Sequence, residues 1–302
     1  MENKSVHSVI LVLDSENDAT FATVMNHQTH ALLLNLVSQF NSSLSTRLHD
    51  EPGYRPFTVS PLRGLTISEG RVILRRDQPC YLRVTLFDGG SLWHQLCAHF
   101  LEAGPVYVQL GDAVLRLIRI LSTPNHDPKG WVGTTDWQTL FTLPAKRSLT
   151  MHFASPTAFS WGDRRFVLFP IPFLLWESLL HAWNRYAPEC FRVERQGLRE
   201  FLLNNVRMTK CSLRTKTLYF PNYTQKGFVG SCSYLIKAPD DDAALLTTLA
   251  AFAYYAGVGY KTTMGMGQVR VTFDDQENDV VLLEGAQLGT EGNTCVTNLL
   301  ER

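Results

Sequence analysis

The stretch Gly257-Val258-Gly259-Tyr260-Lys261-Thr262-Thr263-Met264-Gly265-Met266-Gly267-Gln268 holds four glycines and one lysine within twelve residues. Glycine permits positive φ and lets another backbone or a ligand come close. A lysine in such a loop suggests a phosphate partner. The flanking sequence predicts a helix over 241–256, behind an acidic start, and an alternating strand over 268–273.

Two nucleotide-binding motifs do not fit this loop. A P-loop needs Gly-Lys followed directly by Ser or Thr, after a strand and before a helix. Here Tyr260 separates Gly259 from Lys261, and the order of elements is reversed. The dinucleotide fingerprint needs a third glycine where Thr262 stands. A plain glycine-rich connection between a helix and a strand remains an open interpretation.

The composition is typical of an intracellular globular protein. A chain of 302 residues is long enough for two domains. The six cysteines form no Cys-x-x-Cys pair, which argues against a disulfide framework and favours a reducing compartment. His94, Cys97 and His99 lack a fourth metal ligand nearby. We therefore expect a cytoplasmic protein with no membrane segment, no cofactor and no metal site.

The net charge of zero hides two blocks of opposite charge. Residues 192–237 contain nine basic and two acidic residues, whereas residues 238–302 contain three basic and ten acidic ones. The basic block is a candidate surface for a polyanion. Mutual neutralisation of the two blocks across the fold is the alternative.

The order of the predicted elements repeats in the two halves. Each half reads as strands and helices of a split βαβ, ferredoxin-like unit, so the predicted class is α+β with two tandem domains. We place the domains at 1–145 and 146–302. Within the second half, residues 207–216 and 217–219 are predicted to form a basic hairpin.

Three histidines and an arginine are candidates for proton transfer, RNA contact and charge stabilisation. His49 falls at the predicted C-terminus of a short helix, and a histidine can donate or accept a proton near neutral pH. Arg55 follows six residues later and can stabilise a phosphate or a developing negative charge. His27 and His30 open the preceding helix. Simple helix capping by His49, and solvation of His27 and His30, are the alternatives.

Several segments in the same order resemble one family. The glycine loop resembles the C-terminal signature of the RAMP superfamily, and more narrowly that of the CRISPR-associated endoribonucleases that cut repeat RNA into guide RNAs. The further segments that carry the resemblance are Arg47-Leu48-His49-Asp50 leading to Pro56-Phe57-Thr58-Val59-Ser60-Pro61-Leu62, Phe153-Ala154-Ser155-Pro156-Thr157-Ala158-Phe159, and Leu179 to Pro188.

The resemblance implies two RNA-recognition-motif-like domains and metal-independent cleavage by the ribose 2′-OH, which leaves a 2′,3′-cyclic phosphate and a 5′-OH. It implies His49 as acid or base and Arg55 as a cation where some members have lysine. The family's tyrosine position is Leu34 here, so His30, and more weakly Tyr54, are the substitute candidates. The implied RNA-binding residues are Gly257, Gly259, Lys261, Gly265 and Gly267 in the loop, and Arg207, Lys210, Arg214 and Lys216 in the hairpin.

The expected partner is CRISPR repeat RNA or its crRNA product, with other subunits of an effector complex as further candidates. We expect a monomer or a homodimer. A non-catalytic RNA-binding subunit of such a complex, built on the same fold, is the main alternative. A nucleotide-binding enzyme is a third reading, which the reversed element order disfavours.

Overall fold

The computed structural model describes residues 5–21, 26–51, 53, 55–68, 71–163, 165–220 and 223–273. The first half contains β1 (Ser5–Ser15), β2 (Ala19–Phe21), α1 (Asn26–Phe40), α2 (Ser42–Asp50), β3 (Phe57–Val59), β4 (Thr66–Ser68), β5 (Arg71–Leu74), β6 (Pro79–Gly89), α3 (Ser91–Glu102), β7 (Val106–Leu110), β8 (Ala113–Leu121), η1 (Pro124–His126), β9 (Gly133–Asp136) and α4 (Trp137–Phe141). The second half contains β10 (Ser148–Thr157), β11 (Phe159–Ser160), β12 (Phe166–Val167), α5 (Pro172–Tyr186), η2 (Glu189–Phe191), α6 (Leu198–Asn205), β13 (Val206–Phe220), β14 (Tyr223–Ile236), α7 (Asp240–Ala256), η3 (Thr262–Met264) and β15 (Val269–Phe273).

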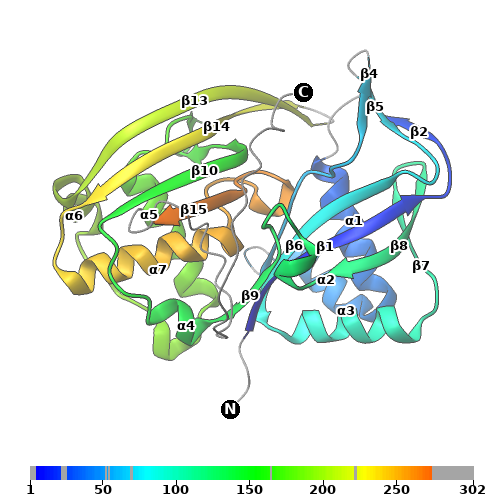
Figure 1. The fold of residues 1–302 in the computed structure, drawn as a ribbon, viewed down its shortest axis with the longest axis horizontal. Coiled ribbons are helices and arrows are strands. Elements are labelled where there is room, and N and C mark those ends of the chain that lie inside the picture. The colour runs from blue at the N-terminus through cyan, green and yellow to red at the C-terminus, as the bar shows by residue number, and fades with distance from the viewer. Residues whose placement is uncertain are drawn as a thin grey trace, which may run out of the picture.

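The two main sheets lie side by side and share one topology (Figure 1). The first runs β3-β6-β1-β8-β7, and the second runs β13-β14-β10-β15. In chain order, the four principal strands are β1, β3, β6 and β8 in the first half, and β10, β13, β14 and β15 in the second. From one edge, both sheets place the second of these strands, then the third, the first and the fourth. Helices follow the first and third strands, so each half is a βαββαβ ferredoxin-like unit. The predicted tandem ferredoxin-like fold is confirmed.

Strand β1 is apolar on both faces, which explains its position inside the first sheet. Val9, Leu11 and Leu13 belong to the core under the helices. Ile10 and Val12 pack on the opposite face against Trp131 and Val132. A strand buried on both faces reads as a continuous hydrophobic run, because neither side can be polar.

Helix α7 holds the two halves together. From Leu246 to Ala256 all of its side chains except that of Tyr254 are buried, and many are alanines such as Ala250 and Ala253. Small side chains let the helix come close to its neighbours, and it contacts α5 and β15 of its own half as well as β1, β3 and β6 of the other. Phe87 of β6 accordingly belongs to the core of the second half.

A buried arginine completes this boundary. Arg83 of β6 is 4% exposed. Its guanidinium donates to the Tyr254 carbonyl oxygen at 2.6 Å and to the side-chain oxygen of Gln268. Burial lowers the pKa of Arg83 to about 10, so it stays protonated at neutral pH. A buried charge is tolerated only when it is hydrogen-bonded. Because the partners Tyr254 and Gln268 belong to the second half, the bonds of Arg83 fix how the halves meet.

The basic hairpin is longer than the sequence predicts. Strand β13 continues through Phe220 and pairs with β14 from Tyr223 onward, so the turn does not fall near residue 216. The pairing shifts register between Met208 and Lys210. Since side chains alternate along a strand, the extra residue at this bulge puts Lys210 on the same face as Arg207.

Within the described residues, no helix is long and apolar enough to cross a membrane.

Candidate functional site

The glycine loop folds back on the segment that ends β10. Gly257, Gly259, Gly265 and Gly267 all have positive φ, and Lys261 adopts a left-handed φ of 57°. Tyr260 N–H donates to the Ala158 carbonyl at 2.8 Å, and Gly267 N–H donates to the Pro156 carbonyl at 3.0 Å. A Cβ on Gly259 or Gly267 would overlap the carbonyl oxygen of Ala158 or Val258, respectively. The glycines are therefore needed for this close backbone contact.

The same loop reaches across the boundary to helix α1. His30 is 6% exposed, its Nδ1 lies 2.9 Å from the Thr263 carbonyl oxygen, and its ring stacks on Phe57. Since a carbonyl only accepts, Nδ1 carries the proton. Burial, opposed by the bond to Thr263 and assisted electrostatically by Arg55 and His49, lowers the pKa of His30 to about 4. The predicted catalytic residues thus share one neighbourhood, and His30 is neutral at pH 7.

Arg55 supports the end of the helix that carries His49. Its guanidinium donates to the carbonyl oxygens of Leu48 at 3.4 Å and His49 at 3.3 Å. These are carbonyls of the last turn of α2, which lack a partner within the helix. Arg55 N–H in turn donates to the Tyr186 hydroxyl of α5 at 3.1 Å. Tyr54, the weaker candidate base, lies outside the described residues.

The His49 imidazole is exposed and paired with a carboxylate. Its Nδ1 lies 2.6 Å from Asp50 Oδ1. His49 borders a shallow hollow of about 300 Å³, and Leu34, at the position where the resemblance places a tyrosine, lines the same hollow. A carboxylate on Nδ1 orients the ring and leaves Nε2 for another partner.

A cleft of about 440 Å³ lies between the halves beside this helix end. Its charged or titratable lining comes from Arg55, His181, Arg185, Tyr186, Tyr260 and Lys261, and no carboxylate belongs to its described lining. Helix α5 supplies His181 on one turn and Arg185 and Tyr186 on the next. Arg185 also donates to the Gly53 carbonyl at 3.2 Å, which holds the 53–55 segment against α5. A cationic cleft without acids suits an anionic ligand.

Lys261 links the cleft to the hairpin. Its ammonium lies 4.3 Å from the ring centroid of Phe220 and 4.4 Å from that of Tyr223, at the end of β13 and the start of β14. Those two rings stack at 4.7 Å. Partial burial lowers the pKa of Lys261. The hairpin end therefore fixes the lysine at the cleft through cation–π contacts.

The four predicted basic residues of the hairpin share one exposed face. They are Arg207, Lys210, Arg214 and Lys216, all exposed on β13. Their cross-strand partners on β14 are small or apolar and carry no acid. At about 3.3 Å per residue, the stripe extends roughly 30 Å, which is long enough to follow several phosphates of a nucleic acid.

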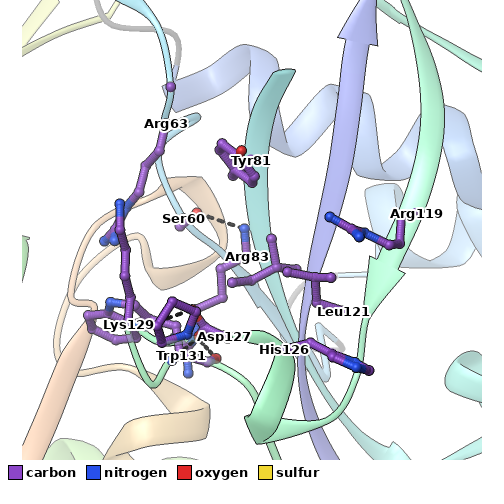
Figure 2. A pocket seen from close by; sticks show the side chains of 13 residues that line it. Ser60, Arg63, Tyr81, Arg83, Arg119, Leu121, His126, Asp127, Lys129 and Trp131 are labelled. Atoms are coloured by element: carbon purple, nitrogen blue, oxygen red, sulfur yellow. Dashed lines mark hydrogen bonds between the residues drawn. The ribbon is translucent and has the colours of Figure 1, made fainter. Parts of the chain in front are cut away.

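A second basic hollow, of about 310 Å³, lies on the first sheet (Figure 2). Arg63, Arg83 and Arg119 reach it from different segments, Lys129 adds to its charge, and His126 also lines it. Three guanidinium carbons lie close to the Trp131 ring centroid: that of Arg63 at 5.2 Å, that of Arg83 at 4.8 Å and that of Arg270 at 4.1 Å. Its one acid, Asp127, accepts from three backbone N–H groups, so the hollow keeps a positive character.

Sequence reasoning missed these contributions from distant segments. His181 and Arg185 lie on a helix rich in aromatic residues, and their spacing of four places them on one helix face. Arg63, Arg119 and Lys129 occur singly and belong to no charged run.

Within the described residues there is no group of three or more His, Cys, Asp or Glu side chains arranged to hold a metal.

Comparison with known proteins gives the family. The fold and site define a protein of two tandem ferredoxin-like domains with a cationic cleft between them. Residues 5–142 match the model of the CRISPR Cas6 N-terminal domain, and residues 151–269 match that of the CRISPR-associated endoribonuclease Cas6. The chain belongs to the Cas6 family of CRISPR-associated endoribonucleases.

Individual relatives agree with this assignment. The Cas6 of Mycobacterium tuberculosis is 26% identical over 131 residues, and that of Streptococcus thermophilus is 27% identical over 121. These alignments cover 43% and 39% of this chain, and 41% and 48% of those relatives. A solved Cas6 product complex is 27% identical with a TM-score of 0.72, over 88% of this chain and 98% of that one. Thermus thermophilus Cas6 gives 26% and 0.64 over the same shares.

Gly267→Ala should destabilise the protein more than Gly104→Ala. Both glycines have φ near +70°, but a Cβ on Gly104 meets nothing within 4 Å, whereas one on Gly267 overlaps backbone. We expect a loss of about 1 kcal/mol at Gly104 from the left-handed conformation, and of about 3 kcal/mol at Gly267, where overlap adds to it. Urea denaturation measures both, and equal losses would contradict the packing described for the loop.

Acid should destabilise the protein through His30. Its pKa of about 4 lies below the value of 6.5 for the unfolded chain, so between pH 6.5 and 4 only the unfolded state takes up the proton. Stability therefore falls as pH falls through this window, by about 1–2 kcal/mol per such histidine from pH 7 to 5. His7, whose pKa burial also lowers to about 4, adds to the effect.

The variant His30→Gln removes that titration and should flatten the decline in the free energy of unfolding between pH 7 and 5. His126→Gln is the control, because His126 is exposed. An unchanged slope in His30→Gln would show that His30 is not held neutral by burial.

Proposed function

We propose that this chain is an endoribonuclease that cuts CRISPR repeat RNA, the pre-crRNA, into guide crRNAs. The observation that carries the proposal is the cationic cleft whose lining residue Arg55 bonds to the backbone carbonyl of His49, while the His49 side chain borders the neighbouring hollow. Membership of the Cas6 family supports it. So do the similar Cas6 proteins that were solved as product and substrate-mimic complexes.

The proposed reaction is an in-line displacement within the RNA. The 2′-oxygen upstream of the scissile phosphate bonds to phosphorus while the bond from phosphorus to the 5′-oxygen breaks. The 2′-OH gives up its proton to a base, and the leaving 5′-oxygen receives one from an acid. The products are a 2′,3′-cyclic phosphate and a 5′-OH, and no redox partner or metal is needed to balance the step.

His49 carries one of the two proton transfers. It is exposed, its Nδ1 is paired with Asp50, and its Nε2 remains for the RNA. An imidazole so oriented can accept a proton as a base or, once protonated, release it as an acid. Replacing it should therefore affect cleavage much more than affinity.

Arg55 and Lys261 stabilise the negative charge that grows on the phosphorane. Both line the cleft, from opposite halves of the protein. A guanidinium is a poor proton donor, so Arg55 acts through its positive charge. Fixed cations in a cleft without acids act where charge develops, with little reorganisation.

The geometry favours a positioning role for His30, in place of the proton transfer expected from the sequence. Its Nδ1 proton is committed to Thr263, and its side chain is buried. A histidine with a pKa of about 4 is also a weak base at pH 7. His181, an exposed histidine of the cleft, is the structural candidate for the second proton transfer.

The RNA outside the cleft would follow the basic surfaces. The stripe from Arg207 to Lys216 leads along the hairpin toward Lys261. On the far side of the second sheet, Arg270 of β15 contacts the Lys129 carbonyl and so adjoins the Trp131 hollow. We assign phosphate contacts to both surfaces, and the glycine loop holds Lys261 between them.

Substitution of His49 tests this function. His49→Ala should slow single-turnover cleavage of cognate repeat RNA by about 10²–10⁴-fold, while the dissociation constant changes little, because the imidazole is exposed and pairs with its chain neighbour Asp50. EDTA should leave the wild-type rate unchanged. End-group analysis should find a 2′,3′-cyclic phosphate and a 5′-OH.

His94→Ala is the matched control, because His94 is an exposed histidine of α3 outside the cleft. Normal cleavage by His49→Ala would overturn the role of that residue. Tight binding of the repeat without any cleavage by the wild-type protein would favour the alternative, a non-catalytic crRNA-binding subunit.

A further inference from the structure

A short hairpin beside the cleft exposes a tryptophan at its tip. Strands β11 and β12 pair through Phe159 with Val167 and Ser160 with Phe166. Trp161 follows directly and closes the tip with a 2.9 Å bond from its N–H to the Arg165 carbonyl. Its side chain is 43% exposed. A large apolar side chain at the tip of a two-residue strand contributes little to a core, so its exposure indicates a ligand-binding role.

The tryptophan is held in place by neighbours that leave part of its surface open. Its ring meets Phe173 of α5 edge-on, with centroids 5.9 Å apart. The Arg199 guanidinium lies 4.6 Å from the Phe173 centroid and 5.6 Å from that of Trp161. Glu177 fixes Arg199 through two contacts of 3.2 and 3.3 Å. These contacts therefore hold the Trp161 ring in one orientation before a ligand binds.

Trp161 borders a hollow of about 340 Å³ whose other wall is the glycine loop. Tyr260 supplies a second aromatic surface, and its ring is fixed by Phe166 at 5.0 Å. Ser178, His181 and Glu177 of α5 line the same hollow. Flat aromatic walls with donors and acceptors between them match a nucleobase, which has π faces and a hydrogen-bonding edge.

The hollow is continuous with the cationic cleft. Ser178, His181 and Tyr260 line both. A ligand in the hollow therefore adjoins the cleft that Arg55 and Lys261 line. The volume is near the lower end of small-ligand sites, which fits one base with its sugar and not a base pair.

We propose that the hollow between Trp161 and Tyr260 binds a single unpaired, unstacked base of the RNA next to the scissile phosphate. The site would fix the RNA register at the cut, because a paired base keeps both faces stacked in its own helix and cannot enter. This inference rests on the proposed function for the identity of the RNA, and on the hollow's own geometry for the base.

Equilibrium binding of an uncleavable repeat RNA, with a 2′-deoxyribose upstream of the cut, tests the site without requiring catalysis. Abasic substitutions are placed one at a time on either side of the scissile phosphate. We expect one position at which base removal weakens wild-type binding about 10-fold or more, since stacking on an aromatic contributes about 1–3 kcal/mol per base. Trp161→Ala should lose a similar factor on intact RNA and nothing further on that abasic RNA.

Trp161→Phe should recover most of the affinity, because it keeps an aromatic face. Tyr107→Ala is the control, since Tyr107 on the first sheet is 44% exposed and lies outside the hollow. Wild-type affinity of Trp161→Ala, or equal losses on intact and every abasic RNA, would overturn the proposal. Failure of the wild-type protein to cleave an unmodified repeat would instead contradict the enzymatic function and leave this binding result to be judged on its own.

Discussion

The contact between the glycine loop and helix α1 is the constraint on which the site depends. The loop can reach α1 only because Gly259 and Gly267 let it lie against the backbone of residues 156–158 and Val258 without a Cβ. From there Thr263 accepts from His30, and Lys261 turns toward the end of the hairpin. If the loop moved outward, the cleft would lose Lys261 and His30 would lose its hydrogen-bond partner.

The cleft is positive because acids are placed elsewhere, although the whole chain is neutral. The three aspartates that begin α7 complement that helix's N-terminus, where negative charge is favourable, and two of them pair with Arg147 and Arg195. Asp127 is satisfied by backbone N–H groups. Part of the opposite charge of the 238–302 block is thus used locally, so the basic face of β13 is left without carboxylates across the strand pair.

The sequence predicts the fold well and the site in part. Alternation and the glycine loop indicate the helix-to-strand order, and the family resemblance points to two ferredoxin-like units. The length of β13 and its bulge near Thr209 do not follow from composition, because register is set by pairing with β14. His181, Arg185 and the residues around Trp131 also escape prediction, because they meet only once α5, β6 and β15 pack together. Burial of His30 likewise depends on Thr263, 233 residues away.

The most direct test is a structure of the protein with cognate repeat RNA that carries a 2′-deoxyribose upstream of the cut. We expect the scissile phosphate to lie in the cleft, within hydrogen-bond distance of Arg55 or Lys261. We expect the His49 ring to face the 2′ position or the 5′-oxygen. A scissile phosphate seated in the Trp131 hollow, or out of reach of His49 and both cations, would contradict it.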